Sequence, residues 1–290
     1  MSILTKKLLE NVTREFSLVE PEWTNDNFTD EDFQFLRDEC NKSSEFDPLN
    51  KRAKLFNEFI NDKALIQVGV CESGKVIAIF ENETQLEDLP WRLWGRIMRM
   101  YSYSKPHKPF KVYFLANTHL RTFPSDDKSI GPENINGGYT YRCNPETILI
   151  YRAEDATRVL IHELLHACCC DNLENDLDTI EAETEAWAEL IYIAVLSQGK
   201  KYIFNDLLKR QSEWIRKQNE EVKKHMRRPE SHEFPWRYTI GKEEIWRRWG
   251  ILREENMSPP IKLNNSLRLT YPPNNMLKER FNIHKKSTIL

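Results

Sequence analysis

The chain has 290 residues, with 42 Lys and Arg against 45 Asp and Glu, and a formal net charge of −3. This near-neutral balance weighs against a general nucleic-acid coat or a polybasic membrane binder, which both need an excess of basic residues. Aromatic residues make up 11% of the chain, a share that excludes a disordered chain because it permits a packed core. There is no GxGxxG or GKS/GKT run, which weighs against a phosphate-binding loop.

The sequence predicts neither a signal peptide nor a membrane span. The opening MSILTKKLLENVTREF is charged and has no continuous apolar stretch. No window approaches the roughly 18 apolar residues that a spanning helix needs. The spacing of the cysteines is not that of a disulfide framework, so we expect reduced thiols in a cytoplasmic, reducing compartment. The cysteines stand at positions 40, 71, 143, 168, 169 and 170.

Hydrophobic periodicity and turn residues predict an α+β fold. In chain order we expect a helix at 30–40 capped by Thr29, hairpin strands at 64–70 and 75–82, a helix at 91–101, strands at 111–116, 138–142 and 147–151, and helices at 155–170, 176–197, 202–225 and 243–249.

Three consecutive regions follow from this order. We predict a helical N-terminal region at 1–62, a core at 63–225, and an extension at 226–290 that completes or covers the cleft of the core.

The segment from Arg158 to Cys168 carries the clearest chemistry, because it contains the motif HExxH. His162 and His166 are four positions apart, so on a helix both imidazoles leave the same face, as two ligands of one zinc ion require. Glu163 follows the first histidine, where its carboxylate can act as a general base on a water at the metal. Apolar residues on both sides of the motif predict a buried helix. The alternative is two core histidines beside an exposed glutamate.

A catalytic zinc needs a third protein ligand. The extension typical of metzincins fails, since Cys169 and Asn172 stand where that pattern has Gly and His. Eighteen residues separate His166 from Glu185 on the next predicted helix. The pattern HExxH-x18-E resembles the gluzincin clan of zinc peptidases, the relatives of thermolysin and aminopeptidase N.

The resemblance implies a zincin-like catalytic core that holds one zinc ion per chain. It implies Glu185 as the third ligand and Glu189 as a partner that orients a ligand histidine. Glu181 is a competing ligand, because a shorter connection would bring it to the metal instead. The alternative for the acidic stripe at 178, 181, 185 and 189 is a solvated helix face.

The resemblance also implies an antiparallel edge strand above the metal, which binds the substrate backbone by strand addition. Residues 136–141 are the candidate, and Gly137 and Gly138 would let a second backbone approach closely. The alternative is a plain hairpin edge. The stretch 134–166 is also similar to zinc-peptidase-like proteins of large eukaryotic DNA viruses, a group with little assigned function.

Other features leave alternatives open. Gluzincins often supply a Tyr or His that stabilises the oxyanion, and Tyr238, His232 and His225 are candidates, with Tyr238 favoured. Cys169 or Cys170 could turn toward the metal as a thiolate and close the site, although small buried residues at a helix interface are commoner. The basic runs 223–228 and 278–286 could touch nucleic acid, but among acidic neighbours such runs more often form solvated faces.

The leading hypothesis is a zinc-dependent peptidase with Glu163 as general base, acting on proteins or peptides and not on nucleic acid or membranes. A viral origin would place it in the host cytoplasm or the virion. The rival hypotheses are a zincin-fold interaction protein, for example a virion component, with zinc as a structural staple, and a nucleic-acid-associated factor. The oligomeric state, the specificity and the choice between endo- and exopeptidase action are not encoded in any motif.

Overall fold

The structure is a computed structural model that describes residues 2–87, 89–102, 108–125, 128–228, 232–252 and 261–271. These residues form two compact units, and each unit is described by itself. The sheet unit comprises Val19–His119 and Asn136–Cys169, and the helical unit comprises residues up to Leu18, Leu120–Ile135 and the described residues from Cys170 onward. The predicted regions are consecutive along the chain, whereas each unit is assembled from separate stretches.

The sheet unit is built on a six-stranded mixed sheet in the order β1-β2-β3-β4-β6-β5. The strands β1, β2 and β3 are antiparallel, β3, β4 and β6 are parallel, and β5 pairs antiparallel with β6 at the edge. Its elements are β1 (Thr24–Asn25), α2 (Asp30–Asn41), α3 (Lys51–Ile60), β2 (Leu65–Cys71), β3 (Gly74–Phe80), η1 (Glu83–Glu87), α4 (Trp91–Ser102), β4 (Phe110–Ala116), β5 (Gly138–Thr140), β6 (Ile148–Ile150) and α6 (Ala156–Ala167).

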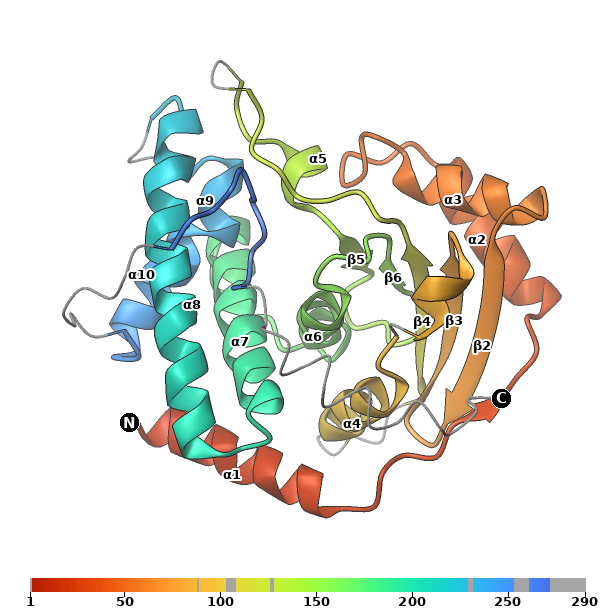
Figure 1. Cartoon of the computed structure of the whole chain (residues 1–290), viewed down its shortest axis with the longest axis horizontal. Coiled ribbons are helices and arrows are strands. Elements are labelled where there is room, and N and C mark those ends of the chain that lie inside the picture. The colour runs from red at the N-terminus through yellow and green to blue at the C-terminus, as the bar shows by residue number, and fades with distance from the viewer. Residues whose placement is uncertain are drawn as a thin grey trace. The chain divides into compact units, whose positions relative to one another are not determined.

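Helices cover both faces of this sheet, with α2 and α3 on one side and α4 and α6 on the other (Figure 1). The central strands β3 and β4 are nearly continuous apolar runs, as expected for parallel strands buried on both faces. On one face, Ile77 and Tyr113 join a core cluster with residues of α2 and α3. On the other, Phe114 packs against Trp94 of α4, with ring centroids 5.4 Å apart.

A buried carboxylate anchors α2 to the sheet. The predicted cap is confirmed, because Thr29 and Asp32 form a reciprocal capping box at the start of α2. Asp32 is also fully buried against the sheet, where it binds Lys75 of β3 and Lys111 of β4 at 3.0 Å each and accepts a hydrogen bond from Tyr113 at 3.2 Å. The same side chain therefore starts the helix and fixes it to two strands.

The helical unit contains α1 (Ile3–Ser17), α5 (Pro132–Ile135), α7 (Leu177–Leu196), α8 (Lys201–Val222), η2 (Lys223–His225), α9 (Phe234–Tyr238) and α10 (Ile240–Arg248). The helix α7 is its centre and contacts α1, α8, α9 and α10. From Thr184 onward α7 is buried on almost every side, so it is a core helix rather than an amphipathic surface helix.

The predicted α+β class is confirmed, and the predicted strands and long helices are present with shifted ends. The predicted helix 155–170 ends earlier, at Ala167, because Cys169 has left-handed backbone geometry with φ of 56°. The likeness of the sheet unit to a zincin core stays a prediction. Among the described residues, no helix combines the length and the apolar character required for a membrane crossing.

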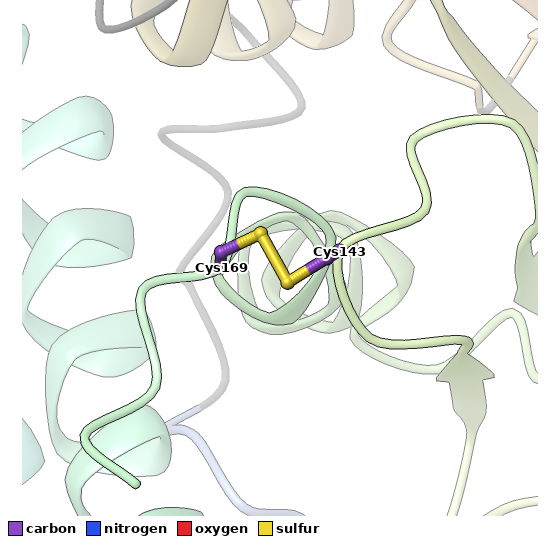
Figure 2. The surroundings of a disulfide bond; sticks show 2 residues. All are labelled: Cys143 and Cys169. Atoms are coloured by element: carbon purple, nitrogen blue, oxygen red, sulfur yellow. A yellow bond between two sulfur atoms is a disulfide. The ribbon is translucent and has the colours of Figure 1, made fainter.

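The expectation of six reduced thiols is wrong for one pair of cysteines. Cys143 and Cys169 form a disulfide across a sequence separation of 26, with Cα atoms 4.7 Å apart (Figure 2). The fold brings the turn that follows β5 next to the end of α6, and the spacing of the cysteines in the sequence does not predict this contact. Cys40, Cys71, Cys168 and Cys170 are thiols.

The anchor of α2 predicts an acid dependence of stability. Burial favours the neutral form of Asp32, but hydrogen bonds from Lys111 and Lys75 outweigh it and lower the pKa of the carboxyl from 3.8 to about 2. The stabilisation is therefore complete above the unfolded-state pKa of about 4 and is lost as the pH falls toward 2. We expect Asp32→Asn to flatten the pH dependence of the free energy of unfolding in this window, measured by urea titration of tryptophan fluorescence. Asp38→Asn, an exposed acid of the same helix, is the control, and an equal slope in both variants would contradict the prediction.

Candidate metal centre

The HExxH motif lies in the sheet unit on α6, a helix that contacts β5 and β6. The apolar residues that flank the motif are buried, which confirms the predicted buried helix. The indole of Trp94 in α4 donates a hydrogen bond to the hydroxyl of Thr157 at 2.9 Å, and the hydroxyl of Tyr101 donates to the carbonyl of Ile161. The motif therefore sits on a helix that is held on more than one side.

The two histidines point to a common position. The Nε2 atoms of His162 and His166 are 3.1 Å apart, and the ring centroids are 4.8 Å apart. Two ligands of a tetrahedral zinc, each at about 2.0–2.1 Å, have donor atoms roughly 3.3 Å apart, so the pair fits this geometry. A hydrogen bond from one ring to the other would also occupy this distance. Of the two rings, His162 is buried and His166 is half-buried.

Glu163 lies next to the edge of the sheet. A Cβ atom placed on Gly138 of β5 would lie 3.2 Å from Oε1 of Glu163 and 2.7 Å from Cγ1 of Val159. Gly138 therefore lets α6 approach the edge strand at a distance that no other residue permits without a shift. The carboxylate is buried, with 4% of its residue surface exposed, and is not the exposed glutamate of the alternative interpretation.

An antiparallel edge strand is present at the predicted place as β5, the last strand in the sheet order, while its role in binding a substrate stays a prediction. The amide of Tyr151 donates to the carbonyl of Gly137 at 2.8 Å, which makes 137·151 and 139·149 the hydrogen-bonded pairs of this ladder. The backbone N–H and C=O groups of Gly138 and Thr140 consequently point away from β6. They form the edge at which a further strand could pair, beside Glu163.

The opposite face of β5 is tied down by a polar network that the sequence analysis missed. The hydroxyl of Tyr139 accepts a hydrogen bond from Arg52 of α3 at 2.6 Å and donates to Glu39 of α2 at 2.7 Å. Burial works against the ionised form of Glu39, but hydrogen bonds from Lys42 and Tyr139 lower its pKa overall. Burial and the neighbouring carboxylate raise the pKa of Tyr139, which keeps its hydroxyl protonated. No spacing rule links residues 39, 52 and 139, so only the fold reveals the network.

The acidic stripe lies on α7 in the helical unit. Glu185 and Glu189 are buried, with 2% and 0% of their surface exposed, so a solvated face does not describe them. Glu189, the predicted partner of a ligand histidine, accepts from Thr270 at 2.6 Å and binds Lys242 at 3.4 Å. Glu181 is half-buried.

The donor chemistry of the two histidines and the glutamates suits a metal ion. The described residues include one group of three side chains that could hold a metal ion, each through one ligand atom: His162, His166 and Glu181. Glu185 has the same donor chemistry and matches the motif spacing. Both glutamates therefore remain candidates for the third ligand.

The three candidates for oxyanion stabilisation all lie in the helical unit. The ring of His225 is stacked on Phe123, and its Nδ1 atom lies at hydrogen-bond distance, 3.0 Å, from the carbonyl oxygen of Lys128. The ring of His232 is stacked on Trp236, with ring centroids 3.7 Å apart. Tyr238 packs against Phe234. Their contacts do not single out one of them, and Tyr238 stays a prediction.

Two further sequence interpretations meet the structure here. Cys169 is not available as a thiolate ligand while its sulfur is bonded to Cys143, and Cys170 is exposed. In the first basic run, Lys224 pairs with Glu221 at 2.7 Å, and the backbone amide of Arg228 binds Glu233. The second run, 278–286, lies outside the described residues.

The close approach at Gly138 predicts a specific cost for a methyl group. Gly138→Ala should lower the free energy of unfolding by about 1–3 kcal/mol, because Val159 must move away from the strand. The cost should be smaller in a Val159→Ala background, where the nearest atom is gone, and a double-mutant cycle by urea unfolding measures the difference. The same cost in both backgrounds would show that this contact does not limit the approach.

No family model, curated protein or solved structure matches this chain.

Proposed function

We propose that the protein is a zinc-dependent peptidase whose metal ligands are His162, His166 and a glutamate of α7. The observation that carries the proposal is local to the sheet unit. Two imidazole Nε2 atoms of α6 lie 3.1 Å apart, and the buried Glu163 of the same helix lies next to Gly138 of the edge strand. Metal-assisted peptide hydrolysis needs side chains that hold the metal, a general base and a surface that binds the substrate backbone, and the two histidines, Glu163 and the edge strand are suited to these three tasks.

Zinc, when bound, would supply a Lewis acid that polarises a peptide carbonyl and acidifies water. The two imidazoles would hold it through Nε2. The third ligand would be Glu185, which the motif spacing favours, or Glu181, which offers a carboxylate oxygen with the histidines. Three protein ligands leave one position open, as catalytic zinc sites have.

Glu163 would carry out the proton transfers of the reaction. Its carboxylate would accept a proton from the attacking water and then donate it to the leaving amine. An extended substrate would pair with the backbone groups of Gly138 and Thr140, which would bring its peptide bonds past Oε1 of Glu163. The burial of Glu163 would exclude bulk water from this step.

The metal content of purified variants tests the ligand set. We expect one zinc per chain in the wild type by elemental analysis of chelator-free protein, and its loss in His162→Ala. Of Glu185→Ala and Glu181→Ala, only one should lose or weaken the metal, because a third ligand is needed once. Glu183→Ala, on the same helix, is the matched control and should keep the metal. A wild type without metal would contradict the proposal and favour a non-catalytic interaction protein.

The role of Glu163 has its own test. Glu163→Gln should keep the zinc but lower the rate of cleavage of labelled casein by about 10²–10⁴-fold, because the amide cannot take the proton. Glu174→Gln, an exposed acid outside the motif, should cleave like the wild type. If Glu163→Gln is as active as the wild type, the general-base assignment is wrong. Metal retention without any cleavage in the wild type would point to a structural zinc.

A further inference from the structure

The backbone of one proposed metal ligand is held by both halves of the disulfide. The carbonyl of His166 accepts a hydrogen bond from the amide of Cys143 and another from the amide of Cys169, both at 3.0 Å. The side chains of the same two residues are joined by the bond between their sulfurs (Figure 2). Two hydrogen bonds and the disulfide therefore close a ring at the carbonyl of His166.

The disulfide joins two elements of the proposed site, β5 and α6. Cys143 lies in the turn that follows β5, where the amide of Asn144 bonds to the carbonyl of Tyr141 at 2.9 Å. Cys169 lies two residues after the last residue of α6. The bridge thus links the end of the edge strand to the end of the ligand helix.

Both cysteines have a backbone conformation that residues with side chains rarely adopt. The φ angles are 58° for Cys143 and 56° for Cys169, in the left-handed region. Such residues keep this geometry only where the surrounding contacts hold them. Here the contacts are the hydrogen bonds to His166 and the disulfide itself, so opening the bond removes part of what holds the turn and the helix end.

The bond is open to reagents from solution. Cys143 and Cys169 are both exposed, whereas Cys168 next to them is buried. A small thiol from solution can therefore reach the residues of the bridge. Attack by one thiolate gives a mixed disulfide, and a second thiol releases it. In total, one protein disulfide and two small thiols are converted into two protein thiols and one small disulfide. The protein thereby gains two electrons and two protons.

We propose that the Cys143–Cys169 disulfide is a redox-sensitive positioning element for His166, so that the metal affinity depends on whether the bond is closed. The inference rests on the proposed metal centre. In the closed state the ring orients the last turn of α6 and, with it, the imidazole of His166. In the open state the left-handed residues relax, and the ligand loses part of its pre-organisation. Loss of a group that orients a ligand typically weakens metal binding by about 10–100-fold.

Zinc competition with a chromophoric chelator, at one fixed pH, tests the proposal. Oxidised wild type is compared with wild type that has been reduced with a phosphine and desalted without oxygen, and with Cys143→Ser/Cys169→Ser. We expect the reduced protein and the double variant to bind zinc about 10-fold more weakly than the oxidised wild type. The zinc affinity of the double variant should not change when the reductant is added. Cys40→Ser/Cys71→Ser keeps the bridge and should respond to reduction as the wild type does.

Hydrogen exchange of the metal-free protein supplies a readout that does not depend on zinc. Amides of residues 163–169 should exchange faster after reduction. Equal zinc affinity in both redox states overturns the inference and leaves the metal centre standing. Tighter binding after reduction also overturns it, because it means that the released thiolates bind the metal. No zinc in either state removes the proposed metal centre itself, while unchanged exchange would show that the bridge does not hold α6.

Discussion

The site depends on the close approach of α6 to the edge of the sheet at Gly138. A side chain at this position would collide with Val159 and crowd Glu163, so the missing Cβ sets how near the helix can come. Because His162 and His166 are on the same helix as Glu163, their distance from the edge strand is set by the same contact. A single glycine thus brings the proposed base, the two histidines of the same helix and the strand-pairing edge close together.

The strand β5 is held from two sides that have different chemistry. Gly138 faces α6, while Tyr139 faces α2 and α3 and binds Glu39 and Arg52. The helix that carries Glu39 is in turn anchored to the sheet through Asp32. Alternation along the strand therefore separates a face suited to chemistry from a face suited to support. The edge remains fixed although, among the described strands, β6 alone pairs with it.

Much of the sheet unit could be predicted from the sequence, because its signals are local. The apolar runs of β3 and β4, the cap at Thr29 and the spacing of HExxH each depend on neighbours a few positions apart. The third ligand could not be settled, since the rotation of α7 about its axis is not encoded in the length of the connection before it. The Tyr139 network and the disulfide were missed for a related reason. Both join residues that only strand order and helix packing bring together.

The brevity of β5 has a consequence for what it can capture. The strand has three residues, and the turn at Cys143 ends it soon afterwards, so only Gly138 and Thr140 offer outward backbone groups. A short edge is a poor template for pairing with other copies of the chain, which protects the molecule against aggregation. It also gives an arriving segment few ladder hydrogen bonds. A segment that pairs there would bind weakly and dissociate quickly, as the product of the proposed peptidase must do after each reaction cycle.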